Sequence, residues 1–154
     1  MTIPSRTTAA MPRTATATTT EDGVPATTDR LHEMLLIDAA NVIGSRPTGW
    51  WRDRPGAARK FVDQVRRAVV SGRLLEPVVV VLEGAAREGV AEGIVDGVSV
   101  VHAAGSGDET LLAIASKSDS QVTLVTADRE LIERAKRIGA EKAGPRWLID
   151  GFLS

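Results

Sequence analysis

A short apolar run that ends in an acid constrains the fold of this chain more than any other feature. Residues 34–41 read Met-Leu-Leu-Ile-Asp-Ala-Ala-Asn, so the apolar stretch stops at Asp38 and an asparagine, Asn41, follows three residues later. A run of this length that is closed by polar residues is typical of a buried strand in a parallel sheet. Open α/β sheets bind ligands beyond the carboxyl ends of their strands, so Asp38 stands where such a fold carries its chemistry.

Strand and helix patterns alternate along the rest of the chain. Apolar, β-branched runs predict further strands at residues 77–83, 98–102, 121–126 and, as a short edge strand, 140–143. Helical spacing and end signals predict helices at residues 55–72, 105–117 and 128–138. The glycine-rich residues 84–97 are expected to form a loop with one helical turn. This alternation implies a parallel sheet with right-handed crossovers.

Length and composition limit the classes of protein that the chain can be. Its 154 residues suit one domain, expected at residues 31–154. Residues 1–30 are dominated by Thr, Ala and Pro without apolar periodicity, so we expect a disordered tail there. The absence of cysteine excludes disulfides and thiolate sites. No run reaches the roughly 18 apolar residues of a membrane span, and no secretory signal is evident, so we expect a cytoplasmic protein with no membrane partner.

Acidic residues follow the predicted strands at three places. Asp38 ends the first strand, Asp108 and Glu109 open the helix after the third, and Asp128 follows the fourth. The carboxyl ends of parallel strands meet at one edge of a sheet, so these acids are expected to converge there. Converging carboxylates repel one another and favour cations, and Mg²⁺ or Mn²⁺ prefers such oxygen ligands. The pattern predicts metal-dependent hydrolysis of phosphodiesters.

Most of these polar residues also have a structural interpretation. Glu109 lies three residues after a serine, which is the spacing of a capping box, and Asp128 has the position of an ordinary N-cap. Asp38 is harder to explain in this way, because an acid at the end of a buried strand is costly to desolvate. Asn41 either caps a turn or orients a metal-bound water. Glu83, at the end of the second strand, is a further candidate for the site.

A local excess of positive charge follows the first strand. Residues 46–73 hold eight Arg or Lys against two acids, although the net charge of the whole chain is −1. Basic side chains beside aromatic rings hold single-stranded nucleic acid by phosphate pairing and base stacking. The candidate platform for RNA consists of Arg46, Trp50, Trp51, Arg52 and Arg54. The alternative is that one of the tryptophans packs on the core and the arginines form a solvated face.

Three motifs in this order resemble the NYN branch of the PIN-like nucleases. They are Leu-Leu-Ile-Asp-Ala-Ala-Asn at residues 35–41, Gly-Ser-Gly-Asp-Glu at residues 105–109 and Val-Thr-Ala-Asp-Arg-Glu at residues 125–130. The resemblance covers residues 33–150. It implies a three-layer α/β/α sandwich around a parallel, roughly five-stranded sheet, and RNA cleavage as the ancestral activity.

The resemblance also implies roles for individual residues. The acids that would bind Mg²⁺ or Mn²⁺ are Asp38, Asp108 with Glu109, and Asp128. Asn41 matches the asparagine of the first motif, and Thr126 matches the small hydroxyl residue before the last acid; both are assigned to the substrate side of the site. The sequence departs from the family at Ala39, where glycine is common, and in having only Glu83 as a candidate for the glutamate that many PIN nucleases carry between the first and middle acids.

These observations favour a metal-dependent ribonuclease that acts on single-stranded RNA. The alternative is a non-catalytic RNA-binding protein that keeps the fold with a weakened site. A nucleotide pyrophosphohydrolase is disfavoured, because residues 84–90 lack the glutamate that the Nudix pattern requires at this step. The sequence leaves the oligomeric state open, a homodimer included, and nothing in it points to an antitoxin partner.

Overall fold

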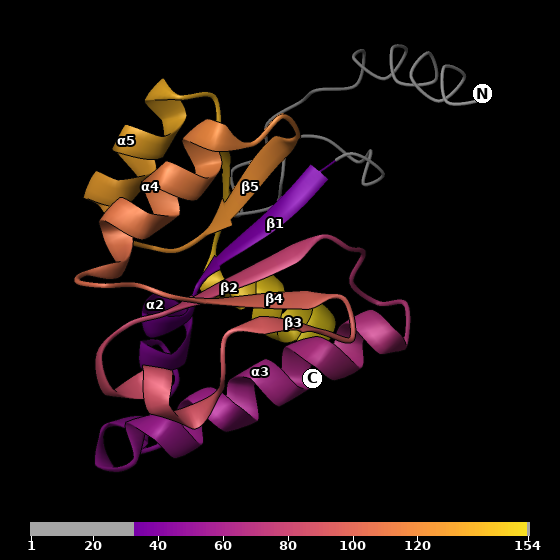
Figure 1. The fold of residues 1–154 in the computed structure, drawn as a ribbon, viewed down its shortest axis with the longest axis vertical. Helices are drawn as coiled ribbons and strands as arrows, with labels where there is room; N and C mark the ends of the chain where they lie inside the picture. Colours follow the sequence, from indigo (N-terminus) through magenta and orange to yellow (C-terminus); the bar gives the residue numbers. More distant parts are fainter. Residues whose placement is uncertain (1–32, 154) are drawn as a thin grey trace.

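The computed structural model describes residues 33–153, which form a mostly parallel sheet with helices on both faces (Figure 1). The strands in chain order are β1 (Glu33–Asp38), β2 (Val78–Leu82), β3 (Gly93–Val95), β4 (Val98–His102), β5 (Gln121–Val125) and β6 (Glu141–Ala143). They lie in the order β3-β4-β2-β1-β5-β6, and all neighbours are parallel except β3 and β4. The strand that ends at Asp38 therefore lies in the middle of the sheet, between β2 and β5.

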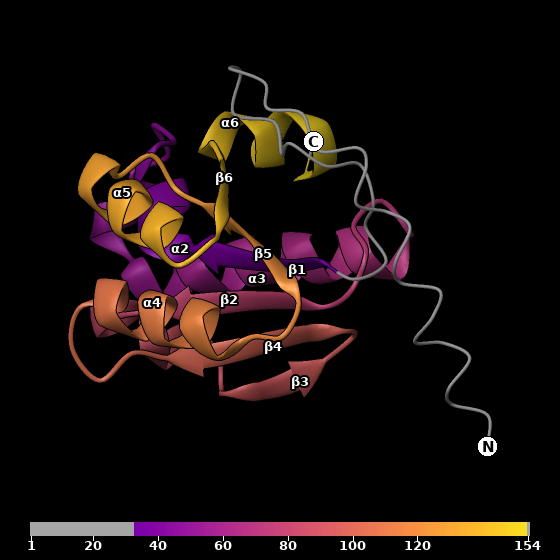
Figure 2. The same ribbon diagram turned by 90° about the horizontal axis from the view of Figure 1, so that it is seen from above.

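The helices divide into two layers, and each layer encloses its own core. They are α2 (Ala39–Gly44), η2 (Trp50–Arg52), α3 (Arg54–Val70), η3 (Gly84–Gly89), α4 (Gly107–Lys117), α5 (Arg129–Arg137), α6 (Pro145–Leu148) and η4 (Ile149–Leu153). Ile37 of β1 packs with α2, α3 and α6, whereas its neighbour Leu36 packs with α4 and α5 on the other face. Figure 2 shows the sheet between these layers. The predicted α/β/α sandwich is confirmed.

The five strands and three helices that the sequence patterns predict are present, as β1, β2, β4, β5 and β6 and as α3, α4 and α5. The four consecutive valines of β2 are buried, as expected for a strand covered on both faces. Helix α3 begins after Asp53, whose side chain accepts a hydrogen bond from the Gly56 N–H at 2.9 Å, and Pro55 occupies its first turn. Within residues 33–153, no helix is long and apolar enough to cross a bilayer. The tail predicted at residues 1–30 lies outside the described residues.

The sheet has six strands rather than five, because part of the predicted loop at residues 84–97 is ordered as a strand. Residues 93–95 pair with β4 in antiparallel fashion. The connection is the pair Asp96 and Gly97, whose φ angles of 53° and 81° are both positive. Two such residues between strands form the tight turn whose twist suits a β-hairpin. The prediction of a loop was therefore wrong for β3, although the helical turn expected in this stretch is present as η3.

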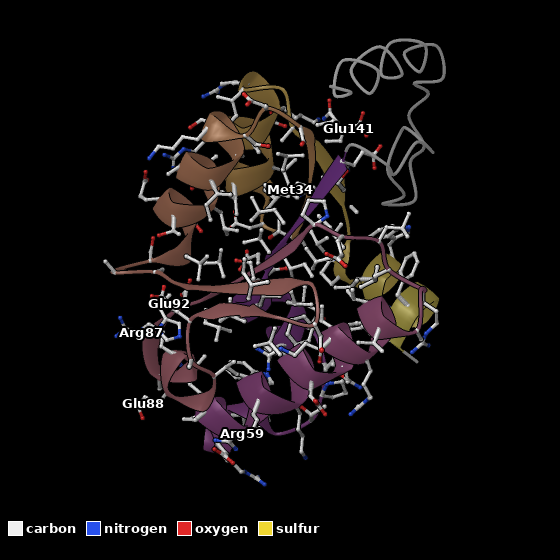
Figure 3. All side chains as sticks on the ribbon, turned by 45° about the vertical axis from the view of Figure 1, so that its right-hand side comes forward. Met34, Arg59, Arg87, Glu88, Glu92 and Glu141 are labelled. Carbon is white, nitrogen blue, oxygen red and sulfur yellow. The ribbon has the colours of Figure 1, made fainter. Side chains whose placement is uncertain are left out.

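The two ends of the sheet carry different segments. Figure 3 shows Met34 and Glu141 at the end opposite to Arg87 and Glu92. Arg87, on η3, donates from Nη1 to the Ala103 carbonyl just after β4, at 3.2 Å. Glu92 accepts a hydrogen bond from the backbone N–H of the last β4 residue at 2.6 Å. These bonds anchor η3 and the start of β3 at the carboxyl end of the parallel strands, where the candidate site lies.

Candidate functional site

Four carboxylates gather at the carboxyl edge of three adjacent strands. Asp38 ends β1, Glu83 follows β2 and Asp128 follows β5, while Asp108 lies in the first turn of α4. The group is close enough for mutual repulsion: Glu83 and Asp108 both raise the pKa of Asp38, and Asp128 and Glu83 both raise the pKa of Asp108. The expected convergence of Asp38, Asp108 and Asp128 is therefore present in the structure, and Glu83 joins them.

Asp38 is the buried centre of this group, with 7% of its surface exposed. Its Oδ2 accepts a hydrogen bond from the Thr126 hydroxyl at 2.9 Å, and its Oδ1 accepts one from the Asn41 backbone N–H at 3.3 Å as the N-cap of α2. Burial raises the pKa of Asp38 to about 6, and the neighbouring carboxylates add to this rise while the two hydrogen bonds oppose it. The carboxyl group thus changes charge close to neutral pH.

A small network fixes the loop between β5 and α5 against α2. The Asn41 Oδ1 accepts a hydrogen bond from the Ala127 N–H at 2.8 Å. The Thr126 hydroxyl oxygen also accepts one from the Asp128 N–H at 3.1 Å, and Asp128 Oδ1 accepts one from the Leu131 N–H at 3.1 Å. Asn41 therefore tethers the loop that carries Thr126 and Asp128, and Asp128 acts as the N-cap of α5.

Glu83 joins the site through a contact with the start of α4. Its Oε1 accepts a hydrogen bond from the Gly107 N–H at 2.7 Å, next to Asp108. A Cβ atom at position 107 would lie 2.4 Å from the same Oε1, so only glycine leaves room for the carboxylate in this position. The sequence signal that identifies Glu83 is its place directly after β2, the neighbour of β1.

Glu109 turns away from the group, toward a neighbouring helix. Its side chain is 73% exposed, and its Oε2 accepts a hydrogen bond from Arg134 Nη2 of α5 at 2.9 Å. The Ser106 side chain forms no capping hydrogen bond, so the capping-box interpretation is wrong. Arg134 also lowers the pKa of Asp108, whose pKa is nevertheless raised by desolvation, by Asp128 and by Glu83.

The chemistry of the four carboxylates suits a hard divalent cation, but their present arrangement is held by the protein backbone. Carboxylate oxygens are the ligands that Mg²⁺ and Mn²⁺ prefer. Within residues 33–153, no three acidic or histidine side chains already lie close enough to share an ion. Asp38, Glu83 and Asp128 each accept a hydrogen bond from a backbone N–H. The donor set fits such an ion in kind, and three of the four carboxylates are bound to backbone N–H groups in this arrangement.

Comparison with solved structures supports the same fold. Rae1 (YacP) from Bacillus subtilis matches with a TM-score of 0.55 at 20% sequence identity, over 76% of this chain and 72% of that one. The two chains share an α/β/α fold. No family model and no curated protein matches the sequence. At this level of identity the likeness to Rae1 shows the fold alone.

The two tryptophans of the predicted RNA platform occupy different environments. Trp50 is half-buried and packs against the core beside α3, whereas Trp51 is 54% exposed. Their rings meet edge to face with centroids 5.8 Å apart. Arg54 Cζ lies 5.3 Å from the Trp50 ring centroid, and Arg52 Cζ lies 5.7 Å from that of Trp51. One ring therefore covers the core, as the alternative interpretation predicts, and the other faces solvent; binding of RNA by the pair stays a prediction.

The platform is joined to the acids by a cavity and by helix α2. A cavity of about 150 Å³ is lined by Trp50 and Arg54 on one side and by Glu83 on another. Arg46 lies apart from it and donates from Nη1 to Gln64 Oε1 of α3 at 3.0 Å.

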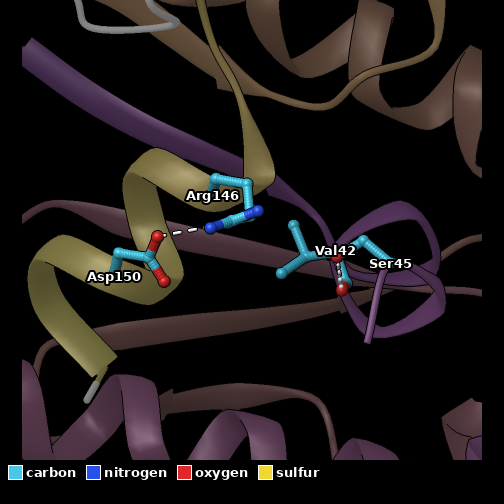
Figure 4. A network of polar contacts seen from close by, with 4 residues as sticks. All are labelled: Val42, Ser45, Arg146 and Asp150. Atoms are coloured by element: carbon cyan, nitrogen blue, oxygen red, sulfur yellow. Dashed lines mark hydrogen bonds and ion pairs between the residues drawn. The ribbon is translucent and has the colours of Figure 1, made fainter. Parts of the chain in front are cut away.

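The end of α2 is closed by Ser45, whose hydroxyl donates to the Val42 carbonyl at 2.7 Å (Figure 4). Figure 4 also shows the exposed Arg146–Asp150 pair, at 3.1 Å, which joins α6 to η4.

Proposed function

We propose that this chain is a metal-dependent nuclease that hydrolyses phosphodiester bonds of single-stranded RNA. The observation that carries the proposal is the convergence of Asp38, Glu83, Asp108 and Asp128 at the carboxyl edge of the sheet. Among residues 33–153, no Arg or Lys side chain forms an ion pair with any of the four. A group of acids that repel one another and form no ion pair favours a cation, and hydrolysis of phosphodiesters is the chemistry that such an ion supports.

The metal ligands in this proposal are Asp38, Asp108 and Asp128, with Glu83 beside them. Bound Mg²⁺ or Mn²⁺ supplies polarisation of a phosphoryl oxygen and a water of lowered pKa. The protein contributes orientation: the Thr126 hydroxyl and the Asn41 N–H hold both oxygens of the Asp38 carboxylate. Because the pKa of Asp38 is about 6, this group is ionised and able to act as a ligand above that pH.

The RNA strand would be held by the basic and aromatic side chains before and within α3. Trp51 with Arg52 offers an exposed ring and a cation, and Arg54 lies over Trp50. Such pairs contact the phosphates and faces of single-stranded nucleic acid. The cavity lined by Trp50, Arg54 and Glu83 supports this proposal, because a strand held at Trp50 and Arg54 would lie beside the acids.

Cleavage of a labelled, unstructured RNA tests the proposal. We expect the wild type to cut in Mn²⁺ or Mg²⁺ and not in EDTA, and Asp38→Asn to be inactive. The matched control is Asp63→Asn, the same change at an exposed acid on α3 that pairs with Arg67; it should cut like the wild type. RNA that stays intact with every metal, or equal activity in Asp38→Asn, would refute the nuclease.

The second candidate is a non-catalytic RNA-binding protein. It is favoured by the hydrogen bonds that already engage Asp38 and Asp128 as helix N-caps. In that case RNA binds, no metal supports cleavage, and Mn²⁺ leaves the thermal unfolding temperature unchanged. A nuclease of the kind proposed binds Mn²⁺ in its folded state, so its unfolding temperature rises with the metal concentration.

A further inference from the structure

The cavity of about 150 Å³ beside the acids has mostly apolar walls, although it lies next to four carboxylates. It lies between α2, the start of α3 and η3, and most of its lining is apolar. The two charged residues in that lining are Arg54 and Glu83. Its remaining wall includes Ala40, two residues after Asp38. The cavity therefore opens next to the carboxylates without being part of their ligand set.

Two of its walls are fixed by packing. Trp50 is half-buried against the core and has Arg54 over its ring. On the other side, η3 lies so close to α3 that a Cβ at Gly89 would come within 2.0 Å of the Pro55 carbonyl oxygen. Arg87 further holds η3 by its hydrogen bonds to the carbonyls of Gly84 and Ala103. The cavity is thus a preformed site, as ligand pockets commonly are.

Small side chains from three separate elements keep the space open. Ala40 lies on α2, Ala57 on α3 and Ala86 on η3, and all three line the cavity. A cavity of this volume is known to take one benzene-sized ring when its walls are apolar. A pyrimidine base is a flat single ring. In this cavity it would meet the Trp50 ring as an aromatic wall, and its phosphate would meet the Arg54 cation at the rim.

We infer that this cavity holds one unstacked pyrimidine base of the RNA, next to the phosphate that the acids hydrolyse. The inference rests on the proposed nuclease function and adds its selectivity. A base inside a duplex is paired and stacked, so it reaches the cavity only at the cost of flipping out. The site therefore selects unpaired nucleotides, and the volume favours a single ring over the fused rings of a purine.

Binding of a fluorine-labelled base tests the cavity without relying on cleavage. The protein carries Asp38→Asn so that the RNA stays intact, and a short RNA carries either 5-fluorouridine, a single-ring base, or 2-fluoroadenosine, a fused-ring base, at one position among adenosines. We expect the fluorine NMR signal of 5-fluorouridine to shift and broaden on binding, and 2-fluoroadenosine and a duplex form of the RNA to respond much less. Equal responses of the two probes, or of single strand and duplex, would overturn the inference.

Filling the cavity gives a matched pair of variants. Ala86→Leu places a larger side chain in the lining, whereas Ala85→Leu makes the same change at the exposed neighbouring alanine, which does not line it. We expect Ala86→Leu to weaken binding of the 5-fluorouridine RNA about tenfold, the loss of roughly one stacked base, and Ala85→Leu to bind normally. Equal binding by the two variants, with equal unfolding temperatures, would overturn the inference.

Abasic RNA provides a test that needs no variant. An abasic residue is moved along the RNA, and cleavage by the wild type is mapped at each phosphate. We expect the cleavage rate to decrease at the phosphate that lies at one fixed distance from the abasic position. A cleavage rate that is the same at every phosphate would count against the cavity. If the wild type cuts no RNA at all, the proposed function fails, while the binding experiments still decide whether the cavity takes a base.

Discussion

The Thr126 hydroxyl donates to Asp38 Oδ2 at 2.9 Å across 88 positions of sequence. The same hydroxyl oxygen accepts the Asp128 N–H at 3.1 Å. One side chain thus joins the acid at the end of β1 to the acid after β5. Because both Asp38 and Thr126 are buried, this contact decides how two of the proposed metal ligands are oriented.

Removing this hydroxyl should move the pH dependence of the site. The hydrogen bond from Thr126 lowers the pKa of Asp38, so Thr126→Val is expected to raise that pKa further above 6 and shift the acid limb of the pH–rate profile to higher pH. We expect a stability loss of about 2 kcal/mol, the usual value for a bond to a charged group. Urea unfolding and kcat measured against pH check both effects.

Thr123 provides the matched control for that change. It is buried like Thr126, but its hydroxyl has no hydrogen-bond partner within the described part of the chain. Replacing such a hydroxyl by a methyl group removes a desolvation cost. Thr123→Val should therefore be neutral or stabilising and leave the pH profile unchanged. Equal effects of the two variants would show that the Thr126 bond has no special role.

Asp38→Asn should make the protein more stable at neutral pH while abolishing cleavage. The folded-state pKa of about 6 lies above the ordinary aspartate pKa of 3.8, so the stability that the neutral carboxyl group provides is present below about pH 4 and is lost as the pH rises through 6. At pH 7.5 the free energy of unfolding of the variant should be about 3 kcal/mol higher, since each of the roughly two pKa units corresponds to about 1.4 kcal/mol. Urea unfolding at pH 7.5 and pH 4 tests this, and an equal gain at both values would contradict it.

The sequence predicted the central part of the fold because its signals are local. The apolar run of β2 and the proline and glycine that bound α3 are each visible within a few residues. The hairpin of β3 and β4 also has a local signal, Asp96-Gly97 between two valines. Four glycines in residues 84–97 outweigh this signal and favour a loop, which is why the sequence pattern does not predict the strand.

The arrangement of the site depends on contacts that the sequence does not contain. The positions of Asp38 and Asp128 at the carboxyl edge of the sheet could be predicted from the sequence, because each follows the end of a predicted strand. The direction of Glu109 toward Arg134 follows from how α4 packs on α5, 25 residues apart. The reach of Glu83 to Gly107 likewise depends on the approach of two separate segments. Position along the chain predicts which acids are near the edge, and packing decides which of them face one another.

Gly107→Ala should impair activity with little loss of stability. The new Cβ would lie 2.4 Å from Glu83 Oε1, and the end of a flexible side chain can move aside more easily than backbone. We expect the Glu83 carboxylate to leave its hydrogen bond with the Gly107 N–H and cleavage to fall about tenfold or more. The control is Gly105→Ala, where a Cβ meets nothing within 4 Å. Equal kcat values for the two variants would contradict a role for the position of Glu83.

Glu109→Gln should retain most of the activity, in contrast to Asp108→Asn. The sequence assigned both acids to catalysis, but Glu109 is 73% exposed and paired with Arg134, whereas the pKa of Asp108 is raised by Asp128 and Glu83. Without the Glu109 charge, Arg134 interacts more strongly with Asp108 and lowers its pKa further. This is a small effect at an exposed site, so we expect a change in cleavage rate of about twofold at most. Asp108→Asn removes a proposed metal ligand and should lower the rate by at least about a hundredfold. Rates measured side by side in Mn²⁺ check this, and similar losses in both variants would place Glu109 among the catalytic acids.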